Sequence, residues 1–125
     1  MVLVDTSVWV SHLRKGNSQL EGLLLDGNVV CHPFVVGELA CGQIKNRREI
    51  LSLLQALPMV KVVGDEELLL FIERNRLMGI GLGLVDVHLM AAAVLAGISL
   101  WTRDRRLRQA CAKLNIDFAS LLKRK

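Results

Sequence analysis

Cysteine is scarce in this 125-residue chain, and its pattern argues against two common uses of the residue. The three cysteines, Cys31, Cys41 and Cys111, are odd in number and form no C-x-x-C pair. A disulfide framework needs an even set of cysteines, and structural zinc sites usually contain closely spaced pairs. We therefore expect free, buried thiols in a reducing cytosol rather than a fold held by disulfides or zinc.

Long hydrophobic runs are also missing, although 52% of the residues are hydrophobic. The longest stretch without a charge, residues 87–102, has 16 residues, whereas a helix that spans a bilayer needs about 20. The N-terminus, MVLVDTS, lacks the basic segment and the cleavage site of a secretory signal. These absences predict a cytoplasmic protein that does not enter the membrane. The hydrophobic content argues against disorder, and the length favours one domain over residues 1–125.

Positive charge is concentrated near the C-terminus. Residues 1–102 carry eight Lys or Arg against ten Asp or Glu, whereas residues 103–125 carry eight against two. Four of these basic residues lie close together, at Arg103, Arg105, Arg106 and Arg108. Such asymmetry suits a polyanionic partner such as RNA, and a solvated helix face is the alternative explanation.

Short apolar runs alternate with helical patterns along the chain. The strand-like segments are VLVDTS (2–7), NVVCH (28–32), MVKVV (59–63), ISLWT (98–102) and IDFAS (116–120). The helical patterns cover residues 6–14, 18–25, 33–41, 46–57, 65–77, 85–96 and 104–114. This alternation predicts an α/β fold with a mainly parallel central sheet.

Four carboxylates stand out from the other acids because of their positions. Asp5 ends the first predicted strand, and Glu38 lies in the helix that follows the second. Asp86 begins an apolar helix, and Asp104 follows the strand ISLWT. Sites in open α/β sheets form beyond the carboxyl ends of the strands, so Asp5 and Asp104 should share one edge. We expect the other two acids to reach that edge from neighbouring helices.

Carboxylates that converge repel one another and need a cation, and all-oxygen ligands suit Mg²⁺ or Mn²⁺. Such an ion polarises a phosphoryl oxygen and activates water during phosphodiester cleavage. Three hydroxyls lie beside these acids in the sequence, on Thr6, Ser7 and Thr102, and can hydrogen-bond a carboxylate or a metal-bound water. Helix capping is the competing explanation for most of these polar residues. We expect that it does not explain Asp86 and Glu38, which have apolar neighbours.

The glycine-rich stretch GIGLG, residues 79–83, does not match a phosphate-binding loop. It lacks the G-x-G-x-x-G pattern, the P-loop lysine and a preceding strand. We interpret it as a flexible turn that lets the next helix pack closely. His88 lies about 200° from Asp86 around that helix, so the two cannot readily share a ligand. We therefore expect His88 to be a core or interface histidine with its hydrogen bonds satisfied.

Four segments, LVDTSVWV, VVGELACG, GIGLGLVDVHLMAAAVLAG and LWTRDRRL, follow one another in an order that resembles the PIN domain. More narrowly, they resemble the VapC-type ribonuclease toxins of bacterial toxin–antitoxin systems. The resemblance runs nearly end to end; the first, third and fourth segments are specific, and the second is a short E-L signal. One departure is Leu107, where related sequences often carry an aromatic residue.

The resemblance implies a three-layer α/β/α sandwich and metal-dependent cleavage of RNA. It implies acidic metal-site roles for Asp5, Glu38, Asp86 and Asp104. Of these, Asp5 and Asp86 are expected to bind Mg²⁺ or Mn²⁺, while Glu38 and Asp104 orient metal-bound water or hold a second ion. The attacking water would leave a 5′-phosphate and a 3′-hydroxyl. The resemblance also implies a homodimer and a small antitoxin that covers the acidic site.

Two other functions remain open on the sequence. A phospho-acceptor receiver domain also has aspartates at strand ends, but VLVDTS offers one acid rather than a pair, and NIDFAS offers no lysine. A non-catalytic, PIN-like RNA-binding module is the other alternative, and the intact acids argue against it.

Overall fold

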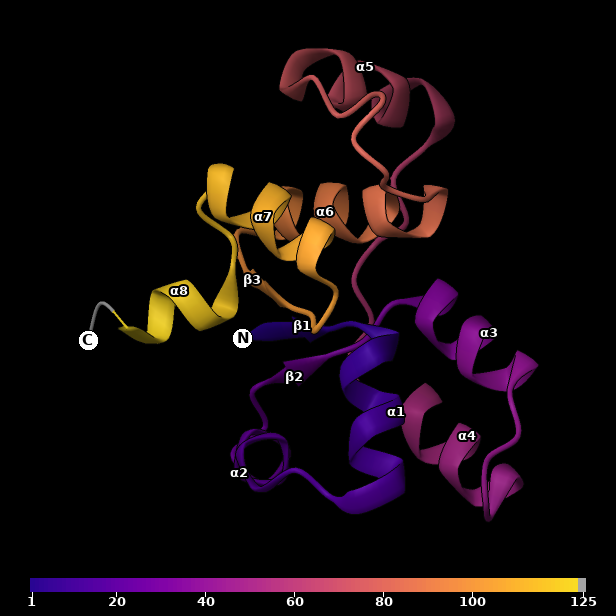
Figure 1. The fold of residues 1–125 in the computed structure, drawn as a ribbon. Coiled ribbons are helices and arrows are strands. Elements are labelled where there is room, and N and C mark those ends of the chain that lie inside the picture. Colours follow the sequence, from indigo (N-terminus) through magenta and orange to yellow (C-terminus); the bar gives the residue numbers. More distant parts are fainter. Residues whose placement is uncertain (124–125) are drawn as a thin grey trace.

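The structure of the chain is a computed structural model that describes residues 1–123, with Lys123 described by its backbone alone. Residues 124–125, which belong to the basic tail, lie outside the described residues. Figure 1 shows the arrangement of the elements. In chain order they are β1 (Val2–Val4), α1 (Thr6–Lys15), α2 (Ser18–Leu25), β2 (Val29–Val30), α3 (Pro33–Cys41), α4 (Arg47–Gln55), α5 (Asp65–Asn75), α6 (Leu84–Ala96), β3 (Ser99–Trp101), α7 (Arg105–Lys113) and α8 (Phe118–Lys123).

A parallel sheet with the strand order β2-β1-β3 lies at the centre of the fold. Val2 is paired with Val29 on one side and with Ser99 on the other. Helices α6 and α7 lie on one side of the sheet, and α1 and α2 lie on the other (Figure 1). Both faces are therefore covered, which is why the central strand VLV is apolar throughout rather than alternating. The predicted α/β/α sandwich is confirmed.

Helix α6 forms a large part of the core. Its residues from Val87 to Ala93 are all buried, and Leu89 and Met90 are completely enclosed. The helix ends at Gly97, whose φ of 67° is the left-handed conformation that commonly terminates a helix. Helix α5 packs against the outer side of α6 (Figure 1). The first turn of α6 lies nearer the surface, where Leu84 is exposed and Asp86 is half-buried.

The seven predicted helices are all present, with ends within two residues of those expected, but two predicted strands are wrong. Residues 59–63 keep only one bridge, between Met59 and Cys31. The partner strand stops there because His32 caps α3, where its Nδ1 accepts from the Phe34 N–H at 2.9 Å.

The segment IDFAS likewise keeps one bridge, between Asp117 and Leu100, and then turns into α8. The Asp117 carboxylate accepts a hydrogen bond from the Ser120 hydroxyl at 2.6 Å, and the Asp117 carbonyl accepts from the Leu121 N–H at 3.1 Å. The Leu121 bond closes the first turn of a helix, and the Ser120 bond holds the Asp117 side chain beside that turn.

The cysteines are unpaired, as expected, but only Cys31 and Cys111 are buried. Cys41, at the end of α3, is exposed, so the expectation of three buried thiols is wrong for this residue. Within residues 1–123, no helix is both long enough and apolar enough to span a lipid bilayer.

Candidate active site

Asp5 follows β1 and is the most enclosed of the four acids, with 5% of its surface exposed. The hydroxyls of Ser7 and Thr102 both donate to its Oδ2, at 2.8 Å and 2.7 Å. The Asp5 backbone N–H donates to the Trp101 carbonyl at 2.9 Å, which joins the ends of β1 and β3. One oxygen of this carboxylate is therefore fixed at the carboxyl edge of the sheet.

Asp104 lies one turn beyond β3 and caps helix α7. Its Oδ1 accepts from the Leu107 N–H at 2.9 Å, and its own N–H donates to the Thr102 hydroxyl at 3.0 Å. Thr102 thus contacts both Asp5 and Asp104. Helix capping accounts for one oxygen of Asp104.

Glu38 reaches the same region from α3. The Thr6 hydroxyl, in the first residue of α1, donates to Glu38 Oε1 at 2.6 Å. Because Thr6 directly follows Asp5, this bond holds Glu38 close to the end of β1. Glu38 is exposed, so its charge is well hydrated.

Asp86 lies in the first turn of α6 and is half-buried. Its Oδ2 accepts from the Gly83 N–H at 3.0 Å, which satisfies one free donor at the start of the helix. The expectation that capping does not explain Asp86 is therefore wrong for one of its two oxygens. Capping was overlooked because Asp86 is the third residue of α6 rather than the one preceding it.

The pKa of Asp86 shows that the four acids share one region. Burial raises the pKa of this carboxyl above its ordinary value, and the Gly83 hydrogen bond lowers it. The negative charges of Asp5, Asp104 and Glu38 raise it further. We call these four residues the carboxylate edge. Two helices, a sheet edge and a helix cap bring them together from positions up to 99 residues apart in sequence.

Each acid of the carboxylate edge uses one oxygen in the hydrogen bonds just described. Within residues 1–123, the second oxygen of each makes no hydrogen bond to the protein. The four acids offer only oxygen donors, which a hard cation prefers, so the chemistry of these residues fits Mg²⁺ or Mn²⁺. Among the described residues, no three acidic, histidine or cysteine side chains are already close enough to hold an ion.

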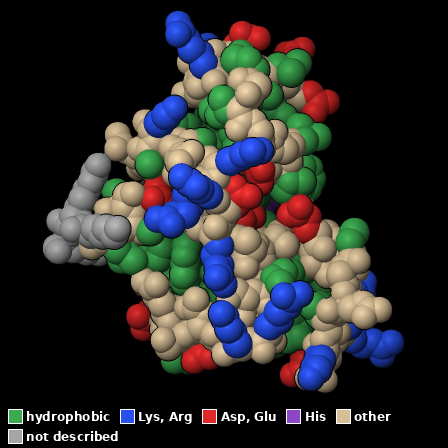
Figure 2. Space-filling model, in the orientation of Figure 1, with side chains coloured by type: hydrophobic (Ala, Val, Ile, Leu, Met, Phe, Trp, Pro, Cys, Tyr) green, Lys and Arg blue, Asp and Glu red, His purple; other side chains and the backbone are tan. Residues whose placement is uncertain are grey.

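Basic side chains gather on one face of the molecule. Figure 2 shows acidic side chains near the centre of one face, with lysines and arginines gathered around them. Arg103 is tied to α1, because its N–H donates to the Ser7 hydroxyl at 3.0 Å and its guanidinium donates to Ser11. Arg105, Arg106 and Arg108 are exposed on α7. Ser11 was missed in the sequence, although its four-residue spacing from Ser7 places both on one helix face.

Two histidines lie buried behind the edge, with ring centroids 6.4 Å apart. His88 is a core residue as expected, but its Nδ1 has no hydrogen-bond partner among the described residues, and neither has Nε2 of His32. The expectation that His88 is satisfied is therefore wrong for this atom. Burial, and the proximity of His88, lower the pKa of His32 to about 4. His32 is consequently neutral at physiological pH.

Comparison with known proteins places the fold and the sequence in one family. The PIN domain family matches residues 2–113. Ribonuclease VapC32 of Mycobacterium tuberculosis, in two strains, is 48% identical over 120 residues, which cover 95% of this chain and 97% of the relative. The crystal structure of PAE2754 from Pyrobaculum aerophilum has a TM-score of 0.67 at 18% identity. That match covers 98% of this chain and 93% of the other, and it shows similarity of fold.

Proposed function

The chain belongs to the PIN domain family, and we propose that it is an endoribonuclease that acts as the toxin of a toxin–antitoxin pair. The observation that carries this proposal is the carboxylate edge, in which each of four acids is held by one oxygen and keeps the other free. The 48% identity to a VapC ribonuclease over nearly the whole chain supports the same function. We take residues 1–125 to form one PIN-like domain.

We propose that Asp5, Glu38, Asp86 and Asp104 are the catalytic acids and that they hold Mg²⁺ or Mn²⁺. When bound, such an ion activates water and offsets the negative charge that develops on the phosphoryl group. Asp5 and Asp86 are the more enclosed acids and are the ligands we favour. Glu38 and Asp104, which are exposed, would orient the attacking water or hold a second ion.

The supporting hydroxyls have a separate task. Ser7 and Thr102 hold Asp5, and Thr6 holds Glu38, so the carboxylates keep their direction while the substrate binds and leaves. Partners of this kind around metal ligands typically affect affinity or activity by about 10–100-fold. Their loss should therefore weaken catalysis without removing an acid.

The RNA strand is proposed to bind across the arginines that follow β3. Arg103, Arg105, Arg106 and Arg108 flank or follow Asp104 in the chain and are exposed, and they would supply positive charge for the phosphates on either side of the cleaved bond. A polyanion would otherwise be repelled by four acids. RNA binding should therefore fall steeply as salt is added.

The proposed partner is a small antitoxin that covers the carboxylate edge and neutralises the enzyme. The naming of the relative as a VapC protein supports this partner. Three free thiols and an RNA substrate fit action in the reducing cytoplasm.

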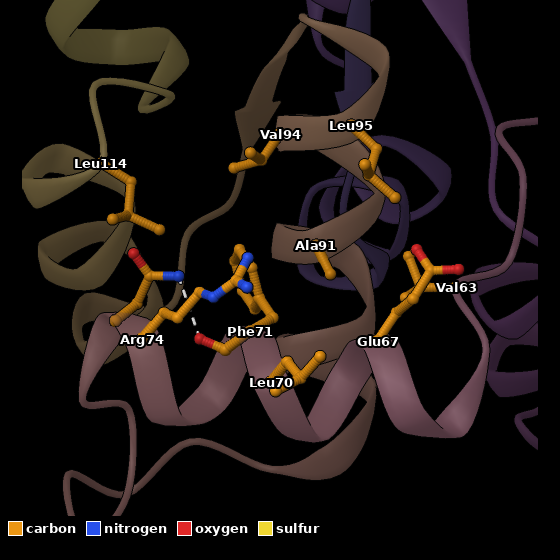
Figure 3. Close-up of a pocket in the computed structure, with 10 residues that line it drawn as sticks. Val63, Glu67, Leu70, Phe71, Arg74, Ala91, Val94, Leu95 and Leu114 are labelled. Atoms are coloured by element: carbon orange, nitrogen blue, oxygen red, sulfur yellow. Dashed lines mark hydrogen bonds between the residues drawn. The ribbon is translucent and has the colours of Figure 1, made fainter.

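A homodimer is the second proposed assembly, and the cleft between α5 and α6 is the surface that favours it. The cleft has a volume of about 400 Å³, and Figure 3 shows Leu70, Phe71, Val94 and Leu95 lining it. Leu70 is 52% exposed and Leu95 65% exposed, which is costly for large apolar side chains unless a partner covers them.

Charge complementarity supports a second copy of the chain as the proposed occupant. Glu67, Leu70, Phe71 and Arg74 lie on one face of α5, with the two charges at opposite ends (Figure 3). A two-fold axis between residues 70 and 71 would pair two α5 helices in antiparallel fashion. Glu67 of each copy would then lie opposite Arg74 of the other, with the leucines between them.

The experiment that tests the function is an RNA cleavage assay with purified protein. We expect cleavage of single-stranded or looped RNA in Mg²⁺ or Mn²⁺, no cleavage in excess EDTA, and products with 5′-phosphate and 3′-hydroxyl ends. Sequencing of those ends identifies the preferred site. Full activity after rigorous chelation would contradict the metal mechanism, and RNA binding without cleavage in any divalent cation would favour a non-catalytic module.

A further inference from the structure

Helix α7 begins with two arginines, Arg105 and Arg106, and its first turn contains no acid. The helix dipole disfavours positive charge at this end, so these residues do not serve the stability of the helix. A residue that departs from such a local preference, here the preference for acids at a helix N-terminus, without stabilising the fold commonly serves function. Arg106 is the more informative of the two, because its side chain lies against a specific neighbour.

That neighbour is Gly81, in the glycine-rich loop of residues 79–83. A Cβ atom placed on Gly81 would lie 2.5 Å from Nη1 of Arg106 and 2.9 Å from its Cδ. The arginine side chain therefore lies directly over the backbone at Gly81, where any other residue would displace it. Gly81 also has a φ of 86°, a conformation that glycine adopts most easily.

The contact joins the two elements that carry Asp86 and Asp104. Gly81 is two residues before Gly83, whose N–H holds Asp86, and Arg106 is two residues after Asp104. Arg106 thereby lies against the loop whose Gly83 N–H holds Asp86.

The hydrogen-bond donors of the Arg106 guanidinium are nevertheless free in the described part of the chain. Within residues 1–123 it forms no hydrogen bond or ion pair, although acids lie on both elements that it joins. An arginine whose role was to neutralise those acids would be paired with one of them. A guanidinium that lies against the backbone at Gly81 and keeps its donors free can hydrogen-bond an anion without first breaking bonds to the protein.

We propose that Gly81 and Arg106 form a phosphate-binding pair for the RNA strand. The glycine leaves the space in which the arginine is held beside the carboxylate edge, and the guanidinium forms charge-assisted hydrogen bonds to a backbone phosphate near the cleaved bond. The glycine-rich loop thus takes part in phosphate binding through the side chain that it positions, rather than through its own N–H groups. The identity of the ligand as RNA rests on the proposed function.

The test is a set of equilibrium binding measurements on the full chain with a short, fluorescently labelled single-stranded RNA in EDTA, where it is not cleaved. The variants are Arg106→Gln, Gly81→Ala and the two combined. Gly79→Ala is the matched control, because Gly79 has a similar φ of 71° but a Cβ atom placed on it would meet no neighbour within 4 Å. Thermal melting of each variant reports the cost to the fold separately.

We expect Arg106→Gln to weaken RNA binding about tenfold and to reduce the slope of log affinity against log salt by about 0.7, the loss of one phosphate contact. Gly81→Ala should weaken binding to a similar degree, and the combined variant should be no weaker than Arg106→Gln alone. Gly79→Ala should lower the melting temperature about as much as Gly81→Ala does, with unchanged affinity for RNA.

An unchanged affinity and salt slope in Arg106→Gln would overturn the proposal and leave the arginine as a packing residue or a contact for a protein partner. If Gly81→Ala weakened binding equally with and without Arg106, the glycine would act through the loop instead. Should Gly81→Ala fail to fold, Arg106→Lys decides, because full recovery of affinity by lysine would show that the fit over the glycine is irrelevant. Failure of the proposed ribonuclease function would appear in the cleavage assay and leave these binding comparisons readable.

Discussion

The carboxylate edge and the α5–α6 cleft each cost free energy when the chain is alone, but the physical cause of the cost differs. At the edge, four acids lie close enough for three of them to raise the pKa of the fourth, Asp86. In the cleft, Leu70 and Leu95 are more than half exposed, and the cost is that of hydrating apolar surface.

This difference fits the partner proposed for each region. Electrostatic repulsion is relieved by a cation, and a cation in turn favours a phosphate, so the edge suits a metal and RNA. Exposed apolar surface is relieved by covering it, which suits a protein. Added salt should therefore weaken binding at the edge strongly and association through the cleft only slightly.

The largest expected effect is the loss of RNA cleavage when one acid of the carboxylate edge is replaced, in Asp86→Asn. Cleavage should fall at least about 100-fold, because a proposed metal ligand is lost while the shape is nearly kept. Asp65→Asn, an exposed acid in the first turn of α5, is the matched control and should leave cleavage unchanged. Normal cleavage by Asp86→Asn would remove this residue from the catalytic set.

The same variant should be at least as stable as the parent in EDTA near neutral pH. The raised pKa of Asp86 means that its charge destabilises the native state as the pH rises above the unfolded pKa, and asparagine can still cap Gly83. Mn²⁺ at about 100 times its dissociation constant should add about 2.7 kcal/mol to the parent and much less to the variant. Thermal melting with and without Mn²⁺ measures both effects; strong destabilisation in EDTA would make Asp86 a structural residue.

The next prediction concerns the pH dependence of stability due to the buried His32, which differs from that due to Asp86. The pKa of His32 is lowered to about 4 in the native state. Below about pH 6.5 the His32 imidazole is therefore protonated in the unfolded chain, whereas in the native state it stays neutral until the pH nears 4. Stability should fall as the pH drops from 6.5 towards 4, opposite to the effect of Asp86. His32→Asn, which keeps an acceptor for the Phe34 N–H, should flatten this fall in urea unfolding. An identical pH profile in both proteins would show that His32 does not titrate as described.

The smallest expected effect tests the cleft. In Arg74→Glu, the new glutamate of each copy would lie opposite Glu67 of the other, so both cross-axis pairs would be repulsive. The dissociation constant of the dimer, followed by light scattering, should rise at least about tenfold. Glu67→Arg combined with Arg74→Glu restores the complementary charges and should restore the dimer. Glu66→Arg, also exposed on α5, is the control. A parent that is monomeric at micromolar concentration, or a dimer that ignores Arg74→Glu, would remove the cleft from the interface.

Local sequence was sufficient for most of the helices, because their ends depend on nearby side chains. Asp104 caps α7 through its own carboxylate, and Gly97 ends α6 through its left-handed backbone. The order of strands and helices also predicted a parallel sheet, since parallel strands require crossovers. The positions of Asp5 and Asp104 at the ends of β1 and β3 followed from this order alone.

Tertiary structure decided what depends on distant partners. MVKVV reads locally as a strand, but it pairs only at Met59 because its partner leaves the sheet at His32. The convergence of Glu38 and Asp86 with the sheet edge required the packing of α3 and α6, which no spacing in the sequence encodes. The contact between Arg106 and Gly81 brings together positions 25 residues apart, and it depends on the conformation of the loop. The sequence by itself determined which side chains can do chemistry here, and only the packing of the helices against the sheet decided which of them meet.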